Sequence, residues 1–553
     1  MVHEPGRLLD TRQPGQCRGS LQRPRLFHDQ SESVGTRSGA QAGPAAGLSL
    51  RGQAALKPMR RASDADMRDV AVIDVGSNSV RLVQFRVEGR ALWPVFNEKT
   101  MAGLGKGAAQ TGRLNPDGVE AALRALKRFS ILLDARGVSE RRAVATAAVR
   151  VCEDGKDFVK RARRQAGLEI EVLSGEEEGR RSALGVLAGL GVADGVTGDL
   201  GGSSLELTRL SGRSVGKAVS LPLGPLSVGV EDLKKARGII DDELEAAASV
   251  LTASGPDFYA VGGAWRAFAQ MAMSLDDYPL RLLHQYEMSA AKVARAADFA
   301  AQQSEASLLA IPGVSAKRAP MLPYAALLLK RLMKRGDFKR VVFSANGLRE
   351  GVLCAAAPEL VSEGDPLLAG ADALARGAAV EAALGPALQD WIAPAFKGET
   401  DVFGAERDAV LRAAAARLAD IGARMHPDHR ADLAFMQTLY APFGGVSHLE
   451  RAFLALAIHH RYQGRKSRPD SCEAVRLLDE NRREAAMKLG LALRLGAALS
   501  GRSAQVLANF KLSRKGELLT LKAGARSEAL VVERGLQRFE QLAEALGLKP
   551  DVR

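Results

Sequence analysis

Two short polar segments contain the residue types that hold a phosphate group together with a divalent cation. The first, Asp74-Val75-Gly76-Ser77-Asn78-Ser79, follows the apolar run Val70–Asp74, which predicts a buried strand. The glycine lets the backbone turn tightly, and three polar side chains supply donors beside backbone N–H groups. A carboxylate at this turn suits a metal-bound phosphate, whereas the plain alternative is a polar turn that only ends a strand.

The second segment, Asp199-Leu200-Gly201-Gly202-Ser203-Ser204-Leu205-Glu206, repeats this pattern. Its glycines and serines lie between two acids, so both carboxylates can face one metal ion or one water molecule. A glycine hairpin between strands is again the plain alternative. Because the two turns lie about 125 positions apart in the same strand–Asp–Gly turn–strand layout, the sequence favours an internal duplication whose turns close on a phosphate chain.

A third segment, Ser174–Arg181, contains three consecutive glutamates at the start of a predicted helix. Acids are common in a first turn because they complement the helix dipole, and this accounts for at least two of the three. The other can act as a general base, since a carboxylate crowded by acids near a metal has a perturbed pKa and can orient water.

The elements that must position these segments alternate between strands and helices, which predicts an α/β domain with a mixed or parallel sheet. Asn115 is expected to cap the first long helix, and Pro116 suits its first turn. The predicted strands are Val70–Asp74, Val80–Val87, Ala143–Ala147, Glu169–Leu173, a strand ending at Gly198–Asp199, Leu205–Leu210, Tyr259–Val261 and Arg340–Ser344; the predicted helices are Leu114–Arg136 and Asp157–Gln165.

Composition changes divide the chain into four parts. Residues 1–68 are rich in Gly, Arg, Gln and Ser, which predicts disorder; a misassigned start codon before Met59 or Met67 and a polyanion-binding basic tail are alternatives. Residues 69–190 and 191–360 are expected to form two α/β domains. Residues 365–553 are Ala/Leu-rich and predict a mostly helical domain, with a strand at Glu517–Leu521.

The charge balance favours a polyanionic partner. The 553 residues include 77 Lys and Arg against 64 Asp and Glu, a net charge of +13. Aromatic residues make up only 5%, so stacking platforms for nucleic acid are scarce, and no specific nucleic acid is expected. No apolar run approaches the ~20 residues of a membrane span. The four cysteines form no CxxC pair, which favours a reducing cytoplasm.

A basic stretch near residue 317 predicts either a solvated helix face or a track for a long polyanion. Trp265 and Tyr324 are expected in the core. The residues of the predicted track are Lys317, Arg318, Lys330, Arg331, Lys334 and Arg335.

Taken in order, these motifs resemble the exopolyphosphatase / guanosine pentaphosphate phosphatase family over about residues 70–355. The resemblance implies duplicated actin-like (RNase H-like) α/β domains, followed by a mostly helical, HD-like C-terminal domain, and a homodimer. The matching motifs are Ile73–Ser79, Ala145–Arg150, Ser174–Arg180, Asp199–Glu206, Leu223-Gly224, Val261–Gly263 and Ser344–Val352.

The resemblance also implies a reaction: Mg²⁺-dependent (or Mn²⁺-dependent) hydrolysis of the terminal phosphate of linear polyphosphate, or of the 5′ γ-phosphate of guanosine pentaphosphate. Glu178 would be the base that activates water. Asp199 and Glu206 would hold the metal or the water, and Asp74 would support the metal. The implied phosphate-binding residues are Gly76, Ser77, Asn78, Ser79, Arg150, Gly201, Gly202, Ser203 and Ser204.

The chain departs from the family pattern in several places. Ser203 replaces a third glycine, and Ala264 replaces a threonine after Gly262-Gly263. The C-terminal histidines lack the His-Asp order of a metal-dependent HD centre, so this domain is expected to be a substrate channel or dimer scaffold. The basic track favours the polymer over the nucleotide; a regulator that binds either ligand without cleaving it is a further alternative.

Overall fold

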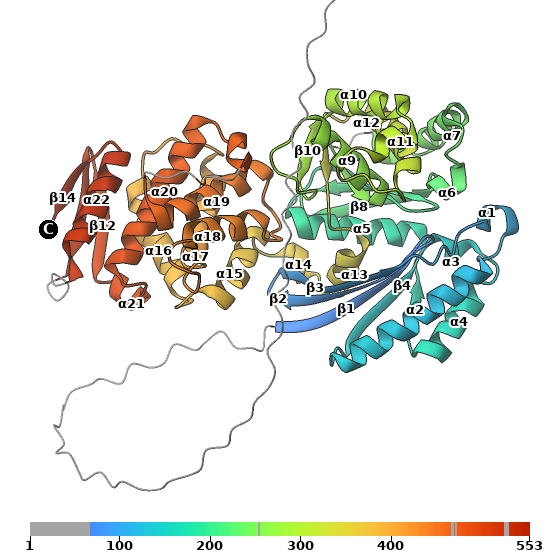
Figure 1. The fold of residues 1–553 in the computed structure, drawn as a ribbon, viewed down its shortest axis with the longest axis horizontal. Helices are drawn as coiled ribbons and strands as arrows, with labels where there is room; N and C mark the ends of the chain where they lie inside the picture. The colour runs from blue at the N-terminus through green and yellow to red at the C-terminus, as the bar shows by residue number, and fades with distance from the viewer. Residues whose placement is uncertain (1–66, 253–254, 466–468, 470–472, 525–529) are drawn as a thin grey trace, which may run out of the picture. The chain divides into compact units, whose positions relative to one another are not determined.

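The computed structural model describes residues 67–252, 255–465, 469, 473–524 and 530–553 (Figure 1). Of the predicted 1–68 segment, all but two residues lie outside the described part. Met67 and Arg68 lie inside it and begin the first strand, because their backbones pair with Glu88 and Val87. No helix within these ranges is long and apolar enough to cross a membrane.

The first sheet has the order β3-β2-β1-β4-β5. Strands β1, β4 and β5 run parallel, and β2 and β3 fold back as antiparallel hairpins. One face is covered by α2 and α4 (Figure 1), whose apolar residues share a core with β1. The bounds are β1 Met67–Val75, β2 Val80–Glu88, β3 Ala91–Thr100, β4 Glu140–Ala145, β5 Ile170–Val172, α2 Pro116–Ala135 and α4 Gly155–Ala166.

The second sheet repeats the layout of the first. Its order is β10-β11-β9-β6-β7-β8, in which β6, β9 and β11 are parallel and β7 and β8 are antiparallel additions. The predicted duplication and actin-like α/β class are therefore confirmed. The bounds are β6 Gly195–Leu200, β7 Leu205–Ser211, β8 Ser214–Leu221, β9 Asp257–Gly262, β10 Tyr286–Ser289 and β11 Arg340–Phe343.

The strands that the sequence analysis missed in these two sheets are all edge strands. Strands β3, β8 and β10 each have only one neighbour in their sheet. An edge strand needs fewer buried residues, and β3 even contains Pro94, which a central strand excludes. The weak apolar signal of these strands follows from their position.

Two helices lie between the sheets and pack backbone against backbone. These are α5 (Gly175–Leu190), which links the sheets, and α13 (Leu348–Ala356), which follows β11. A Cβ atom at Gly185 would overlap the carbonyl oxygen of Gly347, and one at Gly351 would overlap the carbonyl oxygen of Arg181. Side chains of both helices join those of β1 and β9 in one buried cluster.

The outer helices of the second α/β half enclose a separate core. Trp265 and Tyr324 are fully buried in it, as predicted, and donate hydrogen bonds to the carbonyl oxygens of Ala325 (2.9 Å) and Leu223 (2.7 Å). The helices are α7 Leu233–Ala246, α9 Gly263–Leu275, α10 Ala290–Gln302 and α12 Leu322–Arg335; short helices are α1 Ala108–Thr111, α3 Ala147–Val151, α6 Pro225–Val228, α8 Ala248–Leu251, α11 Glu305–Leu309 and α14 Glu359–Ser362.

The expected cap of α2 is only half right. Asn115 occupies the N-cap position and Pro116 the first turn, but the Asn115 side chain makes no capping bond. Its amide donates instead to the carbonyl oxygen of Gly103 at 3.3 Å, because the loop before the helix lies within reach.

The C-terminal region is mostly helical, as predicted, and ends in a small sheet of order β12-β13-β14. Strand β13 contains most of the predicted Glu517–Leu521 strand. The bounds are α15 Pro366–Ala378, α16 Leu384–Ile392, α17 Ala405–Leu418, α18 Arg430–Tyr440, α19 His448–Gln463, α20 Glu480–Leu499, α21 Ala504–Leu507, α22 Glu533–Ala545, β12 Phe510–Lys515, β13 Leu518–Ala523 and β14 Lys549–Val552.

Replacing Gly185 or Gly351 by alanine should destabilise the protein by roughly 1–3 kcal/mol, because the new methyl group has no space beside a backbone carbonyl. Differential scanning calorimetry of the full chain measures the effect as a lower Tm. Gly238→Ala is the matched control: this exposed glycine in α7 has open space around it, so alanine should stabilise the helix by about 0.5–1 kcal/mol. Equal shifts in all three variants would contradict the close helix contact.

Candidate active site

Loops at the carboxyl ends of the parallel strands line a cavity of about 340 Å³. They follow β1, β4, β6, β9 and β11, and so come from both sheets. In open α/β sheets this edge is where ligands bind. Most of the predicted phosphate-binding residues line the cavity: Gly76, Ser77, Asn78, Ser79, Gly201, Gly202 and Ser204.

The two glycine turns have the same backbone geometry. The N–H of Gly76 donates to the carbonyl oxygen of Ser79, and that of Gly201 donates to Ser204, both at 3.0 Å. The turns face each other, since a Cβ at Gly202 would lie 3.3 Å from the Cβ of Ser77. The duplicated motif therefore produces two opposed turns with the same backbone hydrogen bond.

Three predicted acids line this cavity: Asp74, Asp199 and Glu178. Asp74 ends β1 and accepts a hydrogen bond from the Arg349 guanidinium at 3.2 Å. Asp199 accepts one from the Ser182 hydroxyl of α5 at 2.6 Å. Burial raises the pKa of Asp199, and the nearby charge of Asp74 adds to the effect. The two carboxylates thus meet from opposite sheets.

Glu178 differs from its two neighbours in the first turn of α5. Glu177 forms an ion pair with Arg181 at 2.7 Å, and Glu176 is exposed. Glu178 is buried, and Arg150 donates to its Oε2 at 2.8 Å. Burial raises the pKa of Glu178 to about 7, against the opposing effect of Arg150. A carboxyl group that titrates near neutrality is suited to taking a proton from water.

Three predicted site residues lie just outside the cavity lining: Arg150, Ser203 and Glu206. Arg150 contacts Glu178, and the Ser203 carbonyl oxygen accepts from Ser227 at 2.7 Å. Glu206 is 1% exposed and accepts from the Ser220 hydroxyl at 2.8 Å. Burial and the Glu178 charge raise its pKa well above normal. These residues lie behind the lining, and Arg150 bonds directly to Glu178, which lines the cavity.

The acids fit a metal ion that is bound together with substrate. Within the described ranges, no group of three or more His, Cys, Asp or Glu side chains is arranged to hold a metal. Mg²⁺, however, is usually bound by one or two carboxylates with water and substrate phosphates. Asp74 and Asp199 provide such a pair, whereas Glu206 lies behind the lining.

A group of cations that the sequence analysis mostly missed surrounds the same cavity; we call it the cation ring. Burial lowers the pKa of Arg81 to about 10, and Arg349 and Arg266 contribute through their positive charges. The pKa of Lys99 is lowered by burial and then by Arg318. No aromatic side chain is among the lining residues. The ring consists of Arg81, Lys99, Arg266, Lys317, Arg318 and Arg349.

The predicted polyanion track does not form one continuous surface. Lys317 and Arg318 belong to the cation ring. Three cations of α12 instead form ion pairs with acids of α7 and α10, and Lys334 is exposed. These pairs are Lys330–Asp298 at 2.5 Å, Arg331–Asp241 at 2.6 Å and Arg335–Glu245.

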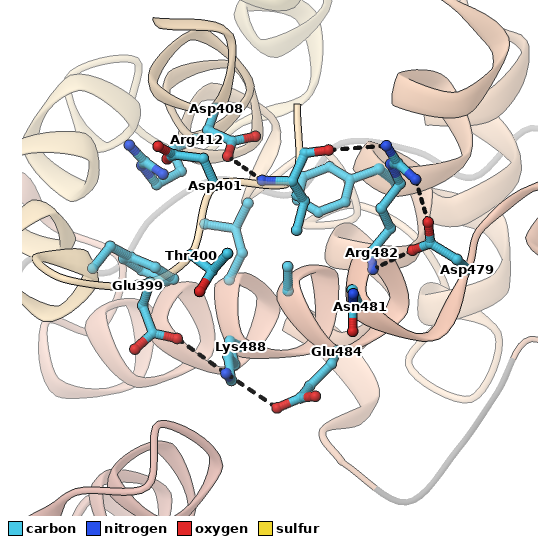
Figure 2. A pocket seen from close by; sticks show the side chains of 15 residues that line it. Glu399, Thr400, Asp401, Asp408, Arg412, Asp479, Asn481, Arg482, Glu484 and Lys488 are labelled. Carbon is cyan, nitrogen blue, oxygen red and sulfur yellow. Dashed lines mark hydrogen bonds and ion pairs between the residues drawn. The ribbon is translucent and has the colours of Figure 1, made fainter. Parts of the chain in front are cut away.

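A second cavity, of about 370 Å³, lies within the C-terminal helices (Figure 2). Figure 2 shows Lys488 between two acids, Glu399 at 3.0 Å and Glu484 at 3.1 Å. Arg482 pairs with Asp479. Since acids neutralise these cations, this cavity lacks the excess of positive charge that the first cavity has.

The C-terminal histidines have protein partners. His459 lies 3.4 Å from Asp432, and His460 shares a 2.7 Å hydrogen bond with the Gly464 carbonyl oxygen. Neither residue lines the C-terminal cavity.

Comparison with known protein families gives a match for the α/β part and another for the C-terminal part of the chain. The Ppx/GppA phosphatase family matches residues 83–360, and the family described as "Exopolyphosphatase, C-terminal" matches residues 367–552. Exopolyphosphatase 1 of Mycobacterium tuberculosis is 27% identical over 299 residues, which is 51% of this chain and 87% of that protein. Exopolyphosphatase 1 of Mycobacterium leprae is 26% identical over 299 residues, 51% of this chain and 88% of that protein.

Two solved structures are also similar. The Aquifex aeolicus member of the Ppx/GppA family is 25% identical, with a TM-score of 0.48, and covers 53% of this chain and 98% of its own. An exopolyphosphatase from Cytophaga hutchinsonii is 23% identical, with a TM-score of 0.48, and covers 52% of this chain and 97% of its own.

Proposed function

The chain belongs to the Ppx/GppA phosphatase family, and we propose that it is an exopolyphosphatase that removes the terminal phosphate of linear inorganic polyphosphate. The observation that carries this proposal is the cation ring around a cavity without aromatic side chains. A polyphosphate chain places a negative charge on every unit, so it can satisfy several cations in succession. A guanine base would find no stacking surface in this lining.

In the proposed reaction the terminal phosphoryl group would lie between the two glycine turns, where backbone N–H groups of the turns and Arg349, which line the cavity, would bind its oxygens. Glu178 accepts a proton from a water molecule, and the water oxygen attacks the terminal phosphorus. The bridging P–O bond breaks, which releases phosphate and a chain shorter by one unit. Catalysis then consists of positioning and charge stabilisation, as is usual for phosphoryl transfer.

A divalent cation is part of the proposal. Asp74 and Asp199 would hold Mg²⁺ or Mn²⁺, which when bound would neutralise charge on the phosphate oxygens. Glu206 would stay behind the lining and outside this pair, where burial and the charge of Glu178 raise its pKa.

The cellular setting and assembly state are further parts of the proposal. We infer a cytoplasmic protein, which is supported by the free, buried thiols of Cys152 and Cys354. A homodimer is proposed from family membership.

The function is tested by measuring phosphate release from long-chain polyphosphate and from guanosine pentaphosphate in parallel, with Mg²⁺. We expect a clear preference for the polymer. Preference for the nucleotide would move the assignment to guanosine pentaphosphate hydrolysis on the same site. Binding without cleavage would favour a regulator. Ser203→Gly and Ala264→Thr, which introduce the residues of the family pattern, would then be the first variants to make.

In the same assay, Lys99→Met and Arg266→Met should raise KM for the polymer by roughly tenfold or more, since a hydrogen bond to a charged group contributes about 1.5–3 kcal/mol. Tripolyphosphate should be affected less, because it reaches fewer cations. Lys334→Met is the control: this exposed lysine on α12 lies outside the ring and should leave KM unchanged.

Glu178→Gln should reduce kcat by roughly 10²–10⁴-fold while leaving polyphosphate binding intact, because an amide cannot accept the proton. Single-turnover phosphate release and isothermal titration calorimetry measure the two effects. Glu176→Gln, an identical exchange at an exposed position two residues away, should not change the rate. Persistent turnover in Glu178→Gln would assign the base elsewhere.

The pH dependence of kcat/KM should show the titration of Glu178. A base works when deprotonated, and its pKa is raised to about 7, so the rate should rise with pH through about 7 and then level off. Arg150→Met removes the cation that lowers this pKa and should move the rising limb to higher pH. Arg164→Met, an exposed arginine on α4, should leave the profile in place.

A further inference from the structure

A half-buried histidine outside the cavity lining connects the active-site loop to the end of α5. His284 lies in the segment before β10, and its Nδ1 accepts a hydrogen bond from the Ala345 N–H at 3.3 Å. Ala345 lines the active-site cavity. On the other side of the ring, Nε2 lies 3.1 Å from the Gly189 carbonyl oxygen, in the last turn of α5.

These two contacts define one form of the imidazole. Because the Ala345 N–H is a donor, Nδ1 must be unprotonated, so Nε2 carries the hydrogen and donates to Gly189. A doubly protonated ring would lose the contact with Ala345. Burial lowers the pKa of His284 to about 4, which keeps the ring neutral under ordinary conditions.

The backbone around this histidine is held in an unusual conformation. The next residue, Gln285, is buried and has a φ of 64°, in the left-handed region that non-glycine residues rarely adopt. Its N–H donates to the Phe343 carbonyl oxygen at 2.8 Å, and its side-chain amide lies 3.4 Å from Gly189 O. Such strain persists where the surroundings over-determine a geometry, often at functional sites.

The accepting carbonyl of Gly189 belongs to the helix that carries the proposed base. It also accepts from the N–H of Gly445 in the C-terminal region at 2.7 Å. A side chain at Gly189 is excluded, because its Cβ would lie 2.8 Å from both the Asn346 amide and the His284 ring. The end of α5 and the C-terminal region therefore meet at this carbonyl group, and the His284 ring links the active-site loop to it.

We propose that His284 is a positioning residue for the reaction, which sets the active-site loop Ser344–Gly347 relative to α5 and thereby relative to Glu178. Its ring touches neither the substrate cavity nor the proposed reacting groups, since only the loop that it holds lines the cavity. The link is direct: Gly347 packs on Gly185 of α5, and the next residues begin α13, which carries Arg349.

Three substitutions in the full chain separate the two contacts of the ring. In His284→Asn the side-chain oxygen takes the place of Nδ1 and can accept from Ala345. In His284→Gln the longer amide can donate to Gly189 but leaves Ala345 without its acceptor. His284→Phe keeps the ring shape and removes both contacts. His448→Phe is the control, because the His448 ring bonds to the His284 carbonyl oxygen and the Tyr278 hydroxyl and packs near the Tyr286 ring, so its replacement leaves the contacts of the His284 ring with Ala345 and Gly189 in place.

Two readouts are measured: kcat and KM for polyphosphate, and hydrogen exchange of the peptide that contains Ala345. We expect His284→Gln and His284→Phe to lower kcat roughly tenfold with little change in KM, and to speed exchange at Ala345. In His284→Asn, kcat and the exchange rate at Ala345 should stay near their wild-type values. His448→Phe should lower Tm without lowering kcat.

Activity that follows Tm across all four variants, or unchanged exchange in His284→Gln, would overturn the proposal. The kinetic readout depends on the proposed function, but the exchange readout does not. If the wild-type protein cleaves no phosphate substrate, the proposed function fails, while altered exchange in His284→Gln and its restoration in His284→Asn still support the role of His284.

Discussion

The contact between α5 and α13, made without side chains at Gly185 and Gly351, is the constraint on which the rest of the site depends. Helix α5 carries Glu178 in its first turn and holds Asp199 through Ser182. Helix α13 carries Arg349, which holds Asp74. Acids from two different sheets therefore reach one cavity because these two helices approach each other closely, and only glycine at the contact allows that approach.

The duplication that creates the two turns also makes them chemically unequal. In the register of the first hairpin, Asp74 pairs with Arg81, and in the second hairpin Asp199 pairs with Glu206. The same position thus has a cation in one half and an acid in the other. Arg81 faces the cavity, while Glu206 is buried behind it next to Glu178. In the proposed reaction, the copy with Arg81 would bind the phosphate chain, and the copy with Glu206 would lie beside Glu178, the proposed base.

Local sequence patterns were sufficient for the turns, the central strands and the α/β alternation, because buried strands and glycine turns leave a signal within a few residues. The choice among the three glutamates was also partly readable, since Glu177 and Arg181 are four apart on a helix, the spacing of an ion pair. Of the cation ring, only Lys317 and Arg318 were predicted, as part of the basic track. Lys99, Arg266 and Arg318 come from a strand end, a helix and a loop that only the tertiary fold brings together.

The pKa shifts in the cavity show why these long-range contacts are tolerated. Burial raises the pKa of Glu178, Asp199 and Glu206 and lowers that of Arg81, Lys99 and Arg266, so both sets of groups lose stability as charged species. Direct pairs such as Asp74–Arg349 neutralise only part of this charge. A folded protein retains such an arrangement when it serves binding or catalysis. A polyanion would relieve the repulsion among the cations, and a divalent cation would relieve that among the acids, so the proposed substrate and metal would complete the electrostatics that the fold leaves unsatisfied.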